Sequence, residues 1–235
     1  MILYKIEPII SKIITSFKEL TLERKITLYI AICIFCYYIF RILQSKYKIV
    51  QFGKKGERRV RKILRKFKGK VYILNDVLLP LYNNYTQIDH VVIGDFGIIV
   101  IETKNFGGFV YGQKDSNNWI QKQGNYKKPF YNPIKQNETH IKTIKYWLNK
   151  NKYSVSNIKN LVYFAGNATI KCNCDLVLNS PDKLKKYVKS QIKSSKKKIN
   201  RKMKKEIYKC LKELNVTSFS AKRKHIKRIN FYKNK

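Results

Sequence analysis

Two apolar runs rich in Val and Ile, on either side of a turn, dominate residues 87–104. Such runs, bounded by Gly, predict two β-strands. If residues 95–96 form a two-residue loop, paired residues have numbers that sum to 191 and Asp89 lies across from Glu102 on one face of the sheet. Lys104, two residues further on, points to that face as well. A turn one residue longer would shift the register and separate the two carboxylates.

Hydrophobic side chains recur at helical spacing in two other segments. Residues 56–67 place apolar side chains on one face and basic ones on the other, and residues 133–149 begin with Pro and carry an apolar stripe. Both predict amphipathic helices, with apolar positions at Val60, Ile63, Leu64, Phe67, Ile134, Ile141, Ile144 and Leu148. Roughly 160 residues remain after the N-terminal segment, the ordinary size of one α/β domain. We expect the helices to cover both faces of a central mixed sheet.

The N-terminal part of the chain contains a continuous apolar run. Between residues 26 and 43 the only charged side chain is Arg41, which can extend toward lipid headgroups. At about 1.5 Å per residue the run is long enough for one membrane crossing. No small-residue cleavage pattern follows it, so it predicts an uncleaved transmembrane helix rather than a secretory signal. The alternative is a buried core helix. Apolar residues ahead of it predict an interfacial amphipathic helix that starts near Pro8.

The charges that flank the apolar run, and the cysteines, indicate on which side of the membrane the rest of the chain lies. Basic residues flank the apolar run on both sides, whereas Glu19 and Glu23 occur only before it. This arrangement favours the cytoplasm for the C-terminal part. The cysteines show neither a disulfide nor a zinc-binding spacing: Cys33, Cys36, Cys172, Cys174 and Cys210. We therefore predict free thiols in a reducing compartment.

The chain is strongly basic, with 51 Lys or Arg, 14 Asp or Glu and a formal net charge of +37. Residues 183–235 alone hold 21 basic residues and two acidic ones. Nucleic-acid phosphate is the expected partner of such a field, and anionic lipid is its competitor. Only 9 of the 51 basic residues are Arg. Because Lys attracts phosphate without reading base edges, we predict little sequence specificity.

Asp89, Glu102 and Lys104 are the strongest candidates for chemistry. Two facing carboxylates in an apolar hairpin repel each other unless a cation lies between them. Their oxygens suit Mg²⁺ or Mn²⁺ rather than Zn²⁺. A neighbouring Lys can help to activate a water or can stabilise charge on a phosphate. The three residues therefore fit metal-assisted phosphodiester hydrolysis, and they equally fit a buried, salt-bridged triad that only stabilises the sheet.

A wider set of motifs resembles the nuclease-related domain (NERD) family of the PD-(D/E)XK, or restriction-endonuclease-like, superfamily. The resemblance covers about residues 53–214 and implies further strands near 161–164 and 175–178. It rests on Gly56-Glu57, Gln87-Ile88-Asp89-His90, Ile101-Glu102-Thr103-Lys104-Asn105, Gly107-Gly108, Gly112, Trp119 and Asn132-Pro133-Ile134-x-Gln136. It implies that Asp89 and Glu102 bind metal, with the Thr103 carbonyl as a further ligand, and that Lys104 is the active-site lysine.

The resemblance implies roles for residues outside the hairpin as well. Glu57 matches an acidic residue on the first helix of many superfamily members; its alternative role is that of a first-turn acid interacting with the helix dipole. Gln136, with His140 one turn further on, is similar to a Gln-x-x-x-Tyr motif of exonuclease relatives, although His replaces the Tyr. His90 lies on the opposite face of its strand from Asp89 and is predicted to be structural.

Aromatic side chains alternate with Gly, Asn, Gln and Lys across residues 105–131. Exposed aromatics after the Glu-x-Lys strand of a nuclease could stack on bases. We instead expect Phe109, Tyr111 and Trp119 to be strand residues packed on the core.

Together these patterns predict a membrane-anchored, Mg²⁺-dependent nuclease of restriction-endonuclease-like α/β fold that hydrolyses DNA with little sequence specificity. One alternative is a non-catalytic membrane tether that binds nucleic acid or another acidic partner through its basic surface. Another is a domain outside the membrane that handles extracellular DNA. The predicted parts are an amphipathic segment (1–25), a transmembrane helix (26–43), a basic linker (44–52), the nuclease-like domain (53–214) and a basic tail (215–235).

Overall fold

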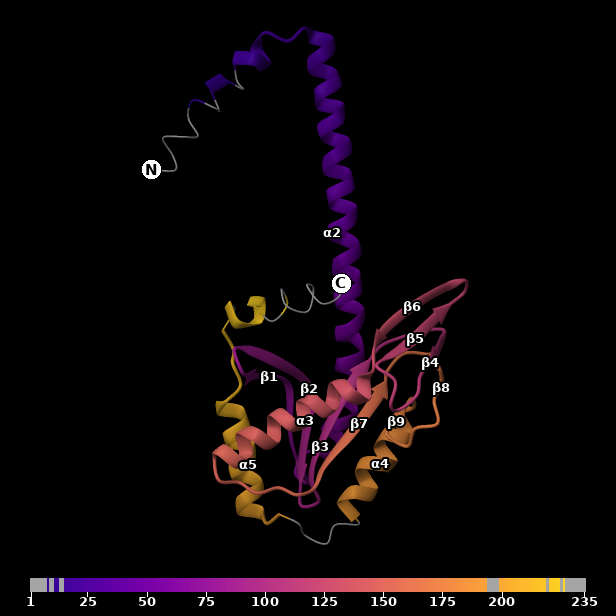
Figure 1. Ribbon diagram of the computed structural model, residues 1–235, viewed down its shortest axis with the longest axis vertical. Helices are drawn as coiled ribbons and strands as arrows, with labels where there is room; N and C mark the ends of the chain where they lie inside the picture. Colours follow the sequence, from indigo (N-terminus) through magenta and orange to yellow (C-terminus); the bar gives the residue numbers. More distant parts are fainter. Residues whose placement is uncertain are drawn as a thin grey trace. The chain divides into compact units, whose positions relative to one another are not determined.

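The chain divides into two compact units, Met1–Gln51 and Phe52–Lys235. The computed structural model describes residues 15–193, 199–218, 220–224 and 226, together with residues 8, 11 and 12 (Figure 1). Much of the predicted amphipathic segment, and the end of the predicted basic tail, lie outside the described residues. The apolar run belongs to the first unit and the candidate site to the second.

The helix α2 (Leu22–Leu64) carries the apolar run and continues through the basic segment after it. Within the described part of the chain, α2 and the short 3₁₀ helix η1 (Arg65–Phe67) form one stretch long and apolar enough to cross a membrane, and its apolar window is unburied. A core helix or a signal sequence can meet the same criterion of length and composition. One prediction is wrong: Gly56 does not begin a helix, because the residues before it, 44–52 included, already belong to α2. No Pro lies between residues 22 and 64 to end the helix earlier.

The second unit is built on a five-stranded sheet with the strand order β1-β2-β3-β7-β9. Neighbours among the first three strands are antiparallel, and the last three are parallel, so the sheet is mixed, as predicted. The strands are β1 (Tyr72–Leu81), β2 (Asn84–Gly94), β3 (Gly97–Lys104), β7 (Ile158–Phe164) and β9 (Val177–Leu178). The last two are the strands expected near 161–164 and 175–178.

The β2–β3 hairpin has the register that the sequence predicted. Gly94 pairs with Gly97 and His90 with Ile101, which leaves residues 95–96 as a two-residue turn. Gly97 has a φ of 112°, a conformation that Gly adopts without strain. Extended by one residue, this register places Asp89 and Glu102 opposite each other, which other turn lengths would prevent.

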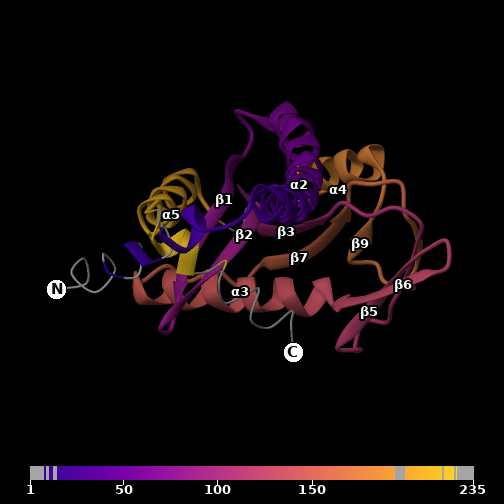
Figure 2. The same ribbon diagram turned by 90° about the horizontal axis from the view of Figure 1, so that it is seen from above.

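Helices cover both faces of this sheet (Figure 2). On one face α3 (Pro133–Lys150) and α5 (Arg201–Glu213) join β1–β3 in a hydrophobic cluster. On the other face the last turns of α2 pack with α4 (Pro181–Lys193) in a second cluster. The predicted apolar positions of both amphipathic segments are buried, except for the partly exposed Phe67. The layer arrangement expected from the hydrophobic pattern is confirmed.

Four shorter strands form a second sheet, with the order β6-β5-β4-β8. They are β4 (Phe109–Tyr111), β5 (Asn118–Gln123), β6 (Tyr126–Tyr131) and β8 (Thr169–Lys171). Trp119 is fully buried and stacks on Phe164, as predicted for a core residue. The same prediction is wrong for Phe109 and Tyr111, which are 44% and 42% exposed. They flank the buried Val110, so they point to the other face of the strand.

The cysteines after β8 correct another prediction. Cys172 and Cys174 form a disulfide, although the sequence predicted free thiols. The bend of the chain brings their Cα atoms to 5.5 Å, within the usual range for a disulfide, so a separation of two residues is sufficient. Cys210 is a buried free thiol on α5.

The residues after α5 are tied to the edge of the main sheet. The Val216 N–H donates to the Leu78 carbonyl at 2.9 Å, and the Leu78 N–H donates to the Asn215 side chain at 2.8 Å. Ala221 is buried. The first residues of the predicted basic tail (215–235) are therefore bonded to the domain.

Candidate active site

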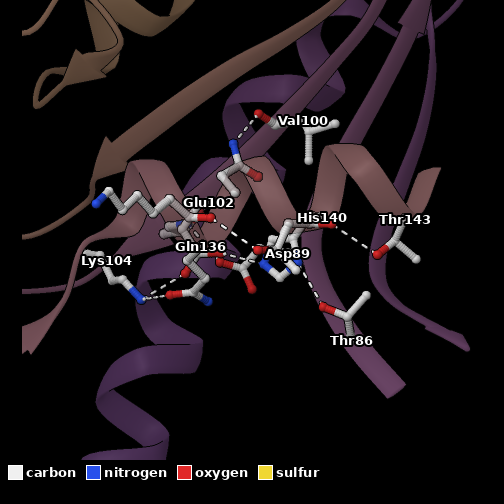
Figure 3. A network of polar contacts seen from close by, with 12 residues as sticks. Thr86, Asp89, Val100, Glu102, Lys104, Gln136, His140 and Thr143 are labelled. Atoms are coloured by element: carbon white, nitrogen blue, oxygen red, sulfur yellow. Dashed lines mark hydrogen bonds and ion pairs between the residues drawn. The ribbon is translucent and has the colours of Figure 1, made fainter. Parts of the chain in front are cut away.

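Polar side chains from two strands and one helix meet at the open end of the β2–β3 hairpin (Figure 3). β2 contributes Asp89, β3 contributes Glu102 and Lys104, and α3 contributes Gln136 and His140. Figure 3 shows these side chains directed toward one another. The structure thus brings Gln136 and His140 to strand residues that lie more than thirty positions earlier in the chain.

Glu102 is the centre of this network. Its side chain is only 3% exposed. One carboxylate oxygen forms an ion pair with Lys104 Nζ at 2.8 Å, and the other lies 3.3 Å from His140 Nε2. Burial alone would raise the pKa of Glu102, but the Lys104 charge and the His140 hydrogen bond outweigh it and lower that pKa to about 2. Glu102 therefore remains ionised under all ordinary conditions.

Asp89 has the opposite electrostatic setting. Its carboxylate accepts a hydrogen bond from the Thr103 backbone N–H at 2.7 Å, and it forms no ion pair among the described residues. Burial, followed by repulsion from Glu102 and Glu57, raises the pKa of Asp89 well above its usual range. The ionised form of Asp89 is thus short of positive charge, which a bound cation would supply.

Lys104 is held between the strand and α3. Its Nζ donates to Gln136 Oε1 at 2.9 Å in addition to its ion pair with Glu102, and its side chain keeps 20% exposure. The start of α3 is fixed by Asn132, whose side chain accepts the Ile134 N–H and donates to the loop carbonyls of Lys114 and Ser116. The Asn-Pro-Ile-x-Gln motif therefore caps the helix that carries Gln136 to Lys104.

His140 joins the network from the next turn of α3. Its Nδ1 lies 2.8 Å from Thr86 Oγ1, and its Nε2 is the atom facing Glu102. A hydroxyl on one side and a carboxylate on the other fix the orientation of this buried ring. His140 had no definite role in the sequence analysis. Its spacing of four residues from Gln136 was the available signal, and Thr86 carried none.

Asn137 is a further residue that sequence reasoning missed. Its side-chain amide donates to the Val100 carbonyl and to Asn160 Oδ1, both at 2.8 Å. These bonds hold α3 against β3 and β7. Asn137 therefore has a structural role: it fixes the position of α3, and with it Gln136 and His140, relative to the sheet.

Glu57 approaches the site from α2 and is partly buried. Burial, then repulsion from Asp76 and Glu102, raises its pKa, while Lys54 and Arg61 oppose the increase. Because α2 begins at Leu22, Glu57 is not in a first turn, and the helix-dipole role considered for it is wrong.

His90 lies on the other face of β2, as the sequence predicted. It is fully buried, and its Nδ1 is 2.7 Å from Asn75 Oδ1. Burial and the nearby Arg61 lower the pKa of His90 to about 3, so the ring is neutral. Its ring hydrogen-bonds to β1 on the face of the sheet opposite Asp89.

The donor atoms of this site fit a hard divalent cation. Asp89 and Glu102 offer carboxylate oxygens, and Asp89 needs a compensating positive charge. Within the described ranges no group of three or more His, Cys, Asp and Glu side chains is arranged to hold a metal ion. Mg²⁺ commonly binds through one or two carboxylates and takes its other ligands from water and substrate phosphate. Two carboxylates are therefore a suitable, although incomplete, ligand set.

The chain is similar in sequence to a protein family and to a relative. The profile of the nuclease-related domain (NERD) family matches residues 52–165, which include every residue of the site described above. An uncharacterized protein of Bacillus anthracis is 43% identical over 98 residues, which cover 41% of this chain and 46% of that protein. The chain thus spans about half the length of this relative. No solved structure shows significant similarity to the chain. Residues 52–165 form a nuclease-related domain of the NERD family.

Proposed function

We propose that this domain is a Mg²⁺-dependent nuclease that hydrolyses DNA phosphodiester bonds with little sequence specificity. The observation that carries the proposal is the meeting of Asp89, Glu102 and Lys104 at the open end of one hairpin, with Asp89 short of positive charge. The family match supports a nuclease-related domain. To this we add the metal dependence, the DNA substrate and the roles of the site residues.

Each residue of the site has a defined part in the proposed reaction. Asp89, Glu102 and the Thr103 carbonyl would hold the metal ion, which supplies a Lewis acid for the phosphate and an activated water. Lys104, which keeps some exposure, donates to a phosphate oxygen and helps to orient the attacking water. Gln136 and Glu102 keep its ammonium group in place. Water adds to phosphorus and releases a proton to solvent, the P–O bond to the leaving oxygen breaks, and that oxygen takes up a proton from solvent.

The basic surface supports an acidic, extended substrate. The chain has a formal net charge of +37, because its Lys and Arg residues greatly outnumber its Asp and Glu residues. Many of the exposed lysines lie on α4 and α5. Such a surface attracts phosphate whatever the base sequence, and its binding weakens as salt rises. We assign Glu57 an auxiliary role in the site, because its negative charge helps to raise the pKa of Asp89.

The test is cleavage of linear and circular DNA by the full chain in detergent, with Mg²⁺ or Mn²⁺ and after metal removal by EDTA. A Lys104→Ala variant is compared with Lys145→Ala, which removes an exposed lysine on α3. We expect metal-dependent cutting that Lys104→Ala abolishes and Lys145→Ala retains. Cutting of the circle would identify an endonuclease. Equal cutting by both variants would contradict the role given to Lys104.

His140→Ala is expected to lower cleavage by about 10–100-fold and to raise the Mg²⁺ concentration needed for half-maximal rate. The reason is that His140 orients Glu102, and loss of such an outer partner weakens metal affinity or activity by this amount. His140→Gln, which keeps a donor, should recover part of the loss. A Mg²⁺ titration of the rate measures both effects, and an unchanged titration curve would show that His140 is only structural.

A second candidate function is a non-catalytic membrane tether that binds nucleic acid or another acidic partner through its basic surface. The observation in its favour is that Lys104 already neutralises Glu102 and is itself satisfied by Gln136. This function predicts salt-sensitive DNA binding that is indifferent to EDTA and to Lys104→Ala, with no cleavage in either protein.

The N-terminal part of α2 is proposed to anchor the domain in the cell membrane as a single span, with the nuclease domain in the cytoplasm. Its unburied apolar window supports an anchor, and the flanking charges support the orientation. The Cys172–Cys174 disulfide is more typical of an oxidising compartment, and so favours the opposite side. Reporter fusions after Lys235 decide between the two: activity of a reporter that works only outside the cytoplasm would overturn the orientation.

A further inference from the structure

The second sheet has one buried face and one exposed face. Its inner face packs Val110 and Trp119, both fully buried, against Ile134 and Phe164. Its outer face presents Phe109, Tyr111 and Ile120, each between 42% and 44% exposed. Large apolar side chains grouped on an exposed surface mark a binding site more often than chance.

Strand pairing sets these side chains in two rows across the sheet. In one row Tyr111 pairs with Ile120 and with Lys171; in the other Phe109 pairs with Lys122 and with Thr169. On β6, Pro129 and Lys127 extend the two rows. The Phe109 and Tyr111 rings stack with centroids 6.3 Å apart and an interplanar angle of 27°. Both rows together form the outer face of the sheet.

The outer face combines flat rings with positive charge. Tyr111, Ile120, Lys122 and Lys127 line an open hollow of about 280 Å³. Neither row contains an Asp or a Glu. Aromatic rings interleaved with lysines suit an anion that also carries flat rings, which describes an unpaired nucleotide: bases stack on the rings and phosphates meet the lysines. A duplex keeps its base faces stacked inside and cannot use the rings in this way.

The outer face also lies near the candidate active site along the chain. Five residue steps separate Lys104 from Phe109, so their Cα atoms are at most about 18 Å apart. A strand bound on the sheet would therefore run within a few nucleotides of Lys104.

We propose that the outer face of the β6-β5-β4-β8 sheet binds an unpaired stretch of nucleic acid, with bases stacked on Phe109 and Tyr111 and phosphates on Lys122 and Lys127. The inference rests on the proposed function in taking nucleic acid as the substrate class. It adds that the substrate carries unpaired bases next to the cleavage site. A second copy of the chain and an anionic membrane are the other occupants that the test must separate.

The test measures binding of fluorescent twelve-nucleotide oligothymidylate, oligouridylate and a duplex of equal length by anisotropy. The full chain is used in detergent, in the Lys104→Ala background and with EDTA, so that cleavage is not needed for the result. Phe109→Ala combined with Tyr111→Ala should weaken binding of the single strands at least tenfold, since each stacked base contributes about 1–3 kcal/mol. Duplex binding and the slope of affinity against salt should stay unchanged.

Two matched variants complete the test. Tyr146→Ala removes an exposed aromatic on α3 and should leave all affinities unchanged. Lys122→Ala combined with Lys127→Ala should reduce the salt slope for single strands by about 1.4, or about 0.7 for each lysine. Preference for the thymidylate or the uridylate strand tells whether DNA or RNA fits better.

Several outcomes would overturn the proposal. Unchanged single-strand affinity in the Phe109/Tyr111 double variant would do so, as would equal loss for single strand and duplex. A change confined to self-association, or to binding of anionic vesicles, would assign the surface to a second copy or to lipid. If the wild-type chain never cuts DNA with Mg²⁺ or Mn²⁺ but the single-strand effect is observed, the surface stands and the nuclease proposal fails.

Discussion

Glu102→Gln is expected to abolish cleavage and to destabilise the domain at the same time. The amide removes a charge that would bind metal and hold Lys104, so we expect the cleavage rate to fall by at least about 10²–10³-fold. DNA affinity should change little, because the basic surface is intact. The free energy of unfolding should fall by about 3 kcal/mol at neutral pH, since burial is outweighed by Lys104 and His140, which lower the pKa of Glu102 from 4.5 to about 2.

The dependence on pH provides a check on this account. A carboxyl whose pKa is lowered by folding stabilises the protein above its ordinary pKa and loses this effect as pH falls toward the folded-state value. Chemical denaturation in EDTA should therefore show a gap between wild type and Glu102→Gln that narrows below about pH 4.5. Glu138→Gln, on the exposed side of α3, serves as the control. Loss of DNA affinity in step with activity would refute the division of roles.

Asp89→Asn is expected to abolish cleavage while stabilising the domain. Burial and the charges of Glu102 and Glu57 raise the pKa of Asp89, so its ionised form opposes folding at neutral pH. The neutral amide removes that cost and can still accept the Thr103 N–H. We expect the melting temperature in EDTA to rise by about 2–4 °C for each kcal/mol regained. The gain should grow as pH increases and vanish near pH 3.8, because a raised pKa favours the folded state only while the group is protonated.

In EDTA we expect Asp89→Asn to melt at a higher temperature than wild type, and Mg²⁺ should reverse this order. A cation that binds only the folded site stabilises it by RT ln(1 + c/Kd), where c is the Mg²⁺ concentration, so the gain rises with the logarithm of c once c exceeds Kd. Wild type should therefore gain melting temperature with Mg²⁺, and Asp89→Asn should not. Differential scanning fluorimetry across a Mg²⁺ series measures both, with Asp115→Asn as an exposed control. An equal Mg²⁺ response in wild type and Asp89→Asn would remove Asp89 from the metal site.

Local patterns in the sequence were sufficient for the main features of the fold. The glycines around residues 95–96 and the Val- and Ile-rich runs set the hairpin register, because a two-residue turn leaves one pairing of the strands. The apolar stripes of α2 and α3 correctly identified the faces that are buried. The predicted faces of Phe109 and Tyr111 were wrong because alternation shows that a strand has two sides and does not show which side the protein covers.

The start of α2 and the pairing of Cys172 with Cys174 were missed for related reasons. A helix continues wherever no residue ends it, so the change in composition after residue 43 did not mark a boundary. The disulfide depends on a local bend that brings two Cα atoms close, and spacing alone does not report that bend.

The sequence by itself determined which residues face one another in the hairpin, since strand periodicity and turn length are local properties. It therefore placed Asp89, Glu102 and Lys104 together. Only the tertiary structure decided how their charges are balanced. The position of α3, fixed by Asn132 and Asn137, brings Gln136 to Lys104 and His140 to Glu102. Within the described residues, Asp89 is left without an ion pair. The physical reason is that electrostatic effects depend on distance and burial, which residues far apart in the chain create only after folding.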